Sequence, residues 1–222
     1  MHQARSNRKG WGNGRGQGHG HGHNHDHGSD LQYRQAHLSS LQAMITATPV
    51  MPLSPAERDD LYAMREEEKV AHDVYVRLYG QWQIPPFRNI SGSEQVHMAA
   101  VLALLEHYGL PDPVQGLGDS QFRDTGMQAL YDRLIGQGLQ SLEEAVRVGL
   151  LIEELDIVDL RAAARRTDKP AILAVYADLE MGSRNHLRAF YQWMQQLGIH
   201  YVPEHLAPEE FQAIARSPHE EC

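Results

Sequence analysis

Residues 91–98 read Ser91-Gly92-Ser93-Glu94-Gln95-Val96-His97-Met98, and the fold can be inferred outward from this stretch. Glu94 and His97 are three residues apart, so on a helix both side chains lie on one face. A carboxylate is costly to bury in an apolar helical core unless it is paired or bound to a metal. The stretch therefore predicts a helix that turns a carboxylate and an imidazole toward a core.

The same stretch has a second interpretation. Ser91 to Glu94 also fits a capping box, in which Glu94 would cap a helix that starts later. The pair Pro85-Pro86 favours the earlier start, because proline is common at the first helical position. Gly92 then lies inside the helix at a cost of about 1 kcal/mol. His97 has its own alternative, that of a core histidine satisfied by hydrogen bonds.

Further segments carry acids where their helices are expected to face inward. Glu68 shares a helical stripe with Tyr75, and Glu67 is the neighbour that a modest rotation of the helix would bring inward. Glu153 lies close to the inward face of a later helix, and Glu154 lies about 100° further round. The position of a residue around its own helix does not exclude either member of the two glutamate pairs as an inward-facing ligand.

The last such segment ends in His186, and its neighbours Leu187 and Phe190 favour an internal helix face. Three residues earlier stands Ser183, which is a poor ligand for iron or manganese. Asp156 or a water molecule is the candidate substitute. Three outcomes stay open: two metal ions with a substitute ligand, one ion, or a vestigial site whose polar residues hydrogen-bond together.

Together these residues predict a buried metal site. Carboxylates bridge pairs of iron or manganese ions in helical bundles, and neutral imidazole completes each coordination sphere. The candidate ligands are Glu67, Glu68, Glu94, His97, Glu153, Glu154 and His186. The candidates for a supporting or substitute role are Asp156, Ser183 and Tyr75. We therefore expect one or two Fe or Mn ions.

Helix signals recur from residue 54 onward. Ser54 to Glu57 is a capping box with proline at the first helical position, and Asp168 is expected to cap a later helix. The expected helices run from Pro55 to Gly80, Pro86 to Tyr108, Met127 to Ile135, Ser141 to Arg166 and Pro170 to Gly198, with a short one after Pro208. No long stretch alternates with period two, so the fold class is all-α.

Several of these segments carry a family resemblance. The run from Phe87 to Met98 is similar to the second bundle helix of rubrerythrin-type ferritin-like proteins. Segments 65–69, 148–157 and 182–190 look like signatures of an uncharacterised ferritin-like family, known only as a domain of unknown function. The resemblance implies a ferritin-like four-helix bundle with a long crossover between its second and third long helices and short accessory helices. It implies no established reaction.

Composition narrows the class of protein. The chain has 222 residues and a net charge of −9; residues 1–30 hold four bases and two acids, so the remainder is −11. An acidic body of this kind predicts no nucleic-acid or membrane partner. The lone cysteine, Cys222, offers no disulfide within one chain. Without an apolar span or a signal-peptide core we expect a cytoplasmic protein, although a trimmed leader and a homo-oligomer stay open.

The N-terminal segment differs from the rest of the chain. It is rich in glycine, and five of its histidines alternate with other residues: His19, His21, His23, His25 and His27. Such a composition predicts a disordered tail with affinity for Zn, Ni or Cu. We therefore divide the chain into a disordered tail and linker at 1–50, a helical bundle at 51–205, and a short helix and tail at 206–222.

Two functional hypotheses follow. The first is a ferritin-like metal-binding protein with a carboxylate and histidine site for Fe or Mn in the bundle core; a redox or oxidative-stress role and enzymatic activity are left open. The alternative is a non-enzymatic metal-handling or structural bundle, with a vestigial core site and a His-rich tail that binds Zn, Ni or Cu.

Overall fold

A computed structural model of the chain describes residues 27–221, with side chains described from residue 31 onward, and its regular structure is entirely helical. The described helices are α1 (His27–Ala47), α2 (Pro55–Trp82), α3 (Pro85–His107), α4 (Thr125–Gly138), α5 (Leu142–Ala164), α6 (Pro170–Leu197) and α7 (Pro208–Arg216). The all-α prediction is confirmed for this part of the chain. None of the described helices combines the length and apolarity that a membrane span requires.

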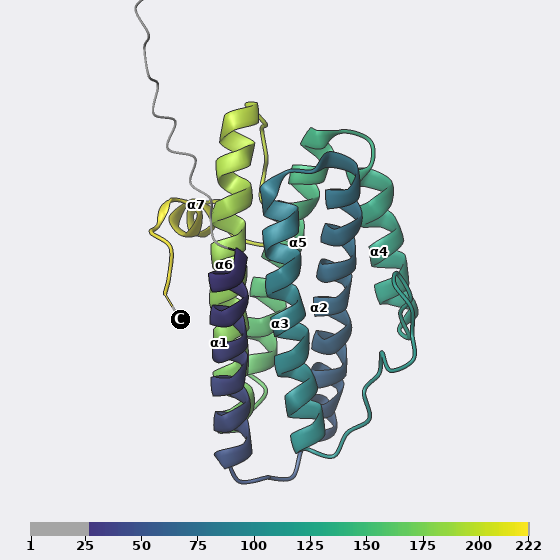
Figure 1. Cartoon of the computed structure of the whole chain (residues 1–222), viewed down its shortest axis with the longest axis vertical. Coiled ribbons are helices and arrows are strands. Elements are labelled where there is room, and N and C mark those ends of the chain that lie inside the picture. Colours follow the sequence, from purple (N-terminus) through teal and green to yellow (C-terminus); the bar gives the residue numbers. More distant parts are fainter. Residues whose placement is uncertain (1–26, 222) are drawn as a thin grey trace, which may run out of the picture.

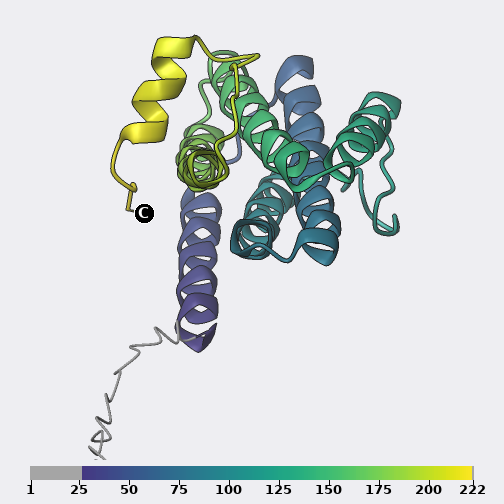
Figure 2. The same cartoon turned by 90° about the horizontal axis from the view of Figure 1, so that it is seen from above.

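Helices α2, α3, α5 and α6 form a bundle that consists of two helix pairs. Helix α2 packs along α3, helix α5 packs along α6, and the pairs meet through α3 with α6 and α2 with α5 (Figure 1). The connection from α3 to α5 is long and contains α4, which covers α2 and α5. Helix α1 lies against α3 and α6. Figure 2 shows α4 and α7 on opposite sides of the bundle.

The helix boundaries follow the predicted signals to within a few residues. The Ser54 hydroxyl accepts a hydrogen bond from the Glu57 amide at 3.2 Å, and the Ser54 amide donates to the Glu57 carboxylate at 2.7 Å. This capping box is confirmed. Helix α2 continues two residues past the expected end at Gly80, and Gln83 then adopts a left-handed conformation with φ 54°.

Two expectations about caps are decided by the structure. Helix α3 begins at Pro85 and passes through Gly92, so Glu94 lies well inside it. The alternative in which Glu94 caps a later helix is therefore wrong. Asp168 is also not a cap: α6 has Lys169 at its N-cap position with no side-chain hydrogen bond, and the Asp168 side chain is 80% exposed and pairs with Lys169.

The apolar core divides into two clusters along the bundle axis. One surrounds Tyr75, Phe87 and Phe190, and the other surrounds Leu104 and Leu179. On α2, α3 and α6 the acids and histidines of the predicted site fall between residues of the two clusters. Hydrophobic burial on both sides, at roughly 25 cal/mol per Å², holds this polar layer in the middle of the bundle.

The assignment of residues 1–50 to a disordered tail and linker is corrected by the structure, in which His27–Ala47 form helix α1. Ile45 is only 2% exposed, and Leu38, Leu41 and Met44 pack against the same apolar cluster. These residues are three or four positions apart, which places them on one helix face. Residues 1–26 lie outside the described part of the chain, so disorder and metal binding in the His-rich tail stay predictions.

Candidate metal centre

Five side chains from four helices meet in the polar layer. They are Glu68 of α2, Glu94 and His97 of α3, Glu153 of α5 and His186 of α6. All five are buried, from 0% exposure at Glu153 to 7% at His186. They form two triads that share Glu94, and within each triad one ligand atom per residue lies within 4.8 Å of the others.

The two triads have matching geometry. His97 Nδ1 lies 2.7 Å from Glu94 Oε2 and 3.2 Å from Glu68 Oε2. His186 Nδ1 lies 2.9 Å from Glu94 Oε1 and 3.3 Å from Glu153 Oε2. The two imidazoles are stacked, with ring centroids 5.6 Å apart. Each oxygen of Glu94 therefore serves one half of the cluster, and both histidines present Nδ1 to the carboxylates.

Several of these buried atoms lack a hydrogen bond from any described residue, although all but Glu68 Oε1 lie at ion-pair distance from a partner. They are Glu68 Oε1, both carboxylate oxygens of Glu94, Glu153 Oε2 and His186 Nδ1. Buried polar atoms are rarely left without a partner. A divalent cation would accept these converging lone pairs, so the donor set fits a carboxylate and imidazole metal site.

The charges of the cluster are strongly coupled. Burial raises the pKa of Glu68 to about 7, although His97 opposes the shift. Burial would likewise raise the pKa of Glu94, but His186 and His97 outweigh it and hold this pKa well below its ordinary value. Burial lowers the pKa of His186, whereas Glu94 and Glu153 raise it, with a net result of about 9. The metal-free imidazoles therefore carry protons that a bound cation would displace.

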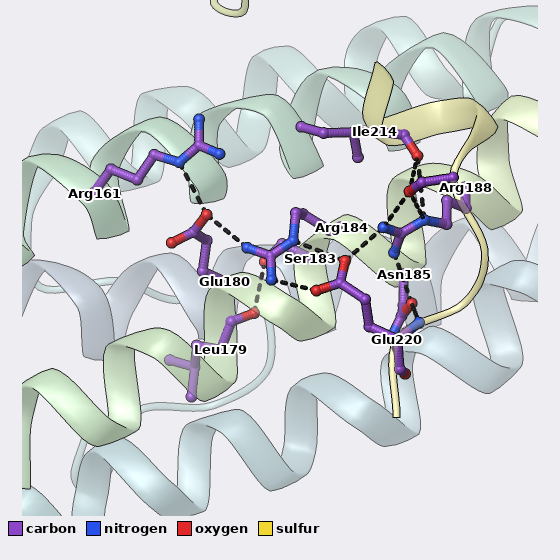
Figure 3. A network of polar contacts seen from close by, with 10 residues as sticks. Arg161, Leu179, Glu180, Ser183, Arg184, Asn185, Arg188, Ile214 and Glu220 are labelled. Atoms are coloured by element: carbon purple, nitrogen blue, oxygen red, sulfur yellow. Dashed lines mark hydrogen bonds and ion pairs between the residues drawn. The ribbon is translucent and has the colours of Figure 1, made fainter. Parts of the chain in front are cut away.

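Ser183 is buried near the second triad but turns to its own helix. Its hydroxyl donates to the Leu179 carbonyl at 3.1 Å (Figure 3). Asp156 lies one turn after Glu153 on α5 and is 6% exposed. Burial and the charges of Glu68, Glu153 and Glu94 raise the pKa of Asp156 well above its usual value. Asp156 belongs to neither triad, so its role as the substitute carboxylate that the sequence suggests stays a prediction.

Tyr75 positions one of the central acids. Its hydroxyl donates to Glu153 Oε1, and its ring packs against Phe87 and Phe190, with centroid distances of 6.0 and 5.4 Å. Burial and the charge of Glu153 raise the pKa of Tyr75 well above 10. The phenol is therefore a neutral donor that fixes one oxygen of Glu153 and leaves the other toward His186.

The structure separates the members of the glutamate pairs. Glu154, predicted as an alternative ligand, lies away from the centre: it accepts from the Tyr201 hydroxyl at 2.5 Å and from the amides of His205 and Leu206, both at 2.9 Å. It therefore anchors the segment after α6. Glu67 belongs to neither triad and lines a separate cavity between α2, α4 and α5.

Two residues near the centre have roles that the sequence reading missed. A Cβ atom at Gly182 would lie 2.6 Å from His97 Nε2, so only glycine allows α6 to approach this imidazole. The available signal was a glycine inside a long helix, which often marks close packing. Glu66 accepts from the amides of Arg123 and Asp124 and fixes the start of α4. Its long-range partners leave no local sequence signal.

A cavity of about 640 Å³ opens onto both imidazoles. It is bounded by α1, α3, α6 and the C-terminal segment, and His97 and His186 form part of its lining. His37 of α1 contacts Asp178 of α6 at 2.9 Å across one wall. Glu220 binds Arg184 and Arg188 and holds the C-terminal segment against another wall (Figure 3). The histidine side of the cluster therefore faces this cavity.

The fold and this cluster define an all-helical protein with a buried carboxylate and histidine centre that could hold a metal. The chain belongs to the uncharacterized protein domain family DUF2202, whose model matches residues 57–218. The uncharacterized protein MJ0754 of Methanocaldococcus jannaschii is 43% identical over 173 residues, which cover 78% of this chain and 94% of the relative. The crystal structure of hypothetical protein MJ0754 from Methanococcus jannaschii is similar, with a TM-score of 0.76 and 42% identity over 78% of this chain and 99% of that one. Neither the family nor the relative has a named function.

Proposed function

We propose that this protein is a ferritin-like metal protein that holds one or two Fe or Mn ions between its two triads. The observation that carries the proposal is the buried pair of triads, in which each oxygen of Glu94 approaches a different histidine. Such an arrangement resembles two adjacent coordination spheres with one bridging carboxylate.

The order of the residues along the chain supports this function. Ferritin-like dimetal proteins use a glutamate from each of two helices and a Glu-x-x-His motif from each of the other two. Here α2 supplies Glu68, α3 supplies Glu94 and His97, α5 supplies Glu153 and α6 supplies His186. The long connection between α3 and α5 matches the crossover of that fold. The one departure is Ser183 where the pattern has glutamate.

The donor set favours Fe or Mn. Carboxylate oxygens outnumber imidazole nitrogens, and neither triad contains a thiolate. A bound Fe or Mn ion supplies redox and Lewis-acid chemistry. The protein residues hold the ion, Tyr75 orients Glu153, and the two apolar clusters limit the access of water. Both triads hold two glutamates and one histidine, but Ser183 adds no carboxylate beside His186, so we expect the triad of Glu68, Glu94 and His97 to bind its ion more tightly.

The competing function is a structural bundle with a vestigial centre. The observation that favours it is the close approach of the histidines to the acids, 2.7 Å at Glu94 and His97, which lets the buried charges compensate one another without a metal. In that case metal handling would fall to the His-rich N-terminal tail. The two functions differ in whether binding depends on Glu94.

The test is the manganese content of the full chain after equilibration with Mn²⁺. Manganese is suitable because it is the weakest of the first-row divalent ions for imidazole sites, so the tail contributes least. Wild type and the control Glu106→Gln, an exposed acid on the same helix, should retain one or two ions that Glu94→Gln loses. Equal manganese content in Glu94→Gln and wild type would refute the metal centre.

A further inference from the structure

A second cavity, of about 120 Å³, lies between α2, α4 and α5. The larger cavity, by contrast, is bounded by α1, α3, α6 and the C-terminal segment, so the two cavities are formed by different helices. Most of the lining is apolar, from residues such as Val70, Leu130 and Ile152. Three acids also face it, Glu67, Asp156 and Asp159, and its described lining includes no lysine or arginine. Apolar packing does not explain why three acids line this cavity.

The innermost of these acids has no partner. Asp156 is 94% buried, being 6% exposed, and among the described residues none forms a hydrogen bond or ion pair with it. Glu67 Oε2 is likewise buried without a hydrogen bond. A buried carboxyl group without a partner costs several kcal/mol, or must stay protonated. The lone pairs of these two side chains are therefore available to a cation that enters the cavity.

The cavity lies beside the proposed metal centre, because two of its acids are close along the chain to residues of the triads. Asp156 lies one helical turn after Glu153 on α5. Glu67 immediately precedes Glu68 on α2. Asp159, one further turn along α5, is partly exposed. The exposure of the acids therefore falls from Asp159, which is partly exposed, to Asp156 and then to the buried triads.

We propose that this acid-lined cavity is a second cation site, through which a partly hydrated divalent cation reaches the centre. The inference rests on the proposed metal-binding function of the centre. The described acids of the cavity do not converge within 4.8 Å as the triads do, so water must complete the ion's coordination there. Oxygen ligands alone favour hard cations such as Mn²⁺ and Mg²⁺. Binding in the cavity is therefore transient, and the centre takes the ion onward.

The test measures how fast the metal-free full chain takes up Mn²⁺. The reaction is stopped with a chelator at successive times, and the manganese retained by the protein is counted. Asp159→Asn should load at least about 10-fold more slowly, because it removes the outermost charge that attracts the ion, yet reach the same final content. The control Asp132→Asn, an exposed acid on α4 outside the cavity, should load like wild type.

A correctly folded Asp159→Asn protein that loads at the wild-type rate would overturn the inference. A second measurement needs no variant: uptake by wild type should slow as ionic strength rises, because salt screens the attraction of the acids. An unchanged rate between low and high salt would also overturn it. The two proposals fail separately. If wild type retains no Glu94-dependent manganese, the proposed metal centre is refuted. If wild type does retain such manganese but Asp159→Asn takes it up at the wild-type rate, only the proposal for the cavity is refuted.

Discussion

Glu153 and Glu154 are adjacent buried acids whose surroundings assign them opposite tasks. Glu153 meets His186 and Tyr75 in the centre, whereas Glu154 accepts three hydrogen bonds from the segment after α6. We predict that Glu153→Gln weakens metal binding at least about 10-fold with little loss of stability. The substitution removes the negative charge of the carboxylate that the proposed site uses as a ligand. Glu154→Gln should leave binding intact and lower the free energy of unfolding by about 2–3 kcal/mol.

The pair of variants is its own control, since the two substitutions are chemically identical and one residue apart. Manganese titration and urea unfolding on both proteins give the comparison. If both variants lost metal binding to the same degree, the separate assignment of the two glutamates would be wrong.

Gly182 makes a second prediction at the scale of single residues. Its missing side chain makes room for His97, so Gly182→Ala must push the imidazole away from Glu68 and Glu94. We expect weaker manganese binding by at least about 10-fold, because a metal site depends on the placement of its ligands. The control is Gly80→Ala, where a Cβ atom meets nothing within 4 Å and where alanine should stabilise the helix by about 0.5–1 kcal/mol. Equal binding in both variants would show that the glycine has no part in the centre.

Sequence reasoning identified only some of the residues of the centre unambiguously. The Glu-x-x-His spacing on α3 was sufficient to predict Glu94 and His97, because helical phase needs no information from elsewhere. The choice between Glu153 and Glu154 was out of reach, since it depends on Tyr201 and a loop about 50 residues away in sequence. Gly182 was missed for the same reason, because its role is set by an imidazole on another helix.

At the scale of elements, α1 is the helix that sequence reasoning did not find. Ile45, 2% exposed, anchors it to the apolar cluster around Leu104. We predict that Ile45→Ala lowers the free energy of unfolding of the whole protein by about 2–4 kcal/mol, because it leaves a cavity in a shared core. The exposed neighbour Thr46→Ala should change stability by less than about 0.5 kcal/mol. Calorimetric unfolding would measure both, and equal stability of the two variants would mean that α1 is not part of the folded unit.

The helices differ in how clearly local sequence signals predict them. Helix α2 opens with a capping box and α5 with Ser141, whose hydroxyl accepts from the Glu144 amide, so both starts were predictable. Helix α1 has sparse apolar residues among glutamines and serines, and it follows a tail of glycines and histidines. Its stability comes from docking on α3 and α6, which is a tertiary effect that local patterns do not carry.

At the scale of the whole molecule, the C-terminal segment closes over α6 through Glu220. The guanidinium groups of Arg184 and Arg188 lower the pKa of Glu220 to about 2, against an ordinary value of 4.5. A lowered pKa in the folded state means that the interaction contributes above about pH 4.5 and is lost as the pH falls toward 2. Glu220 is 34% exposed, so solvent screening limits its contribution to about 1 kcal/mol.

We therefore predict that Glu220→Gln is less stable than wild type at pH 7 and that the difference shrinks as the pH approaches 2. Thermal unfolding of both proteins across this range would show it. The matched control is Glu221→Gln, a neighbouring exposed acid. A difference between wild type and Glu220→Gln that stayed constant down to pH 2 would contradict the ion-pair account of this contact.

Apart from α1, the architecture was accessible from sequence, because helices α2 to α7, their order and the long connection before α5 follow from local signals. What local signals could not supply is how the helices face one another. That arrangement places Glu94 between two histidines and places Asp156, one helical turn from Glu153, in the lining of the acidic cavity.

The most direct test of the metal centre is anomalous X-ray diffraction from crystals of the full chain grown with Mn²⁺, because it locates the ion rather than counting it. We expect a strong manganese peak bounded by Glu68, Glu94 and His97, and a second, weaker peak between Glu94, Glu153 and His186. A map with no manganese peak between α2, α3, α5 and α6, even with ions bound elsewhere, would contradict the centre.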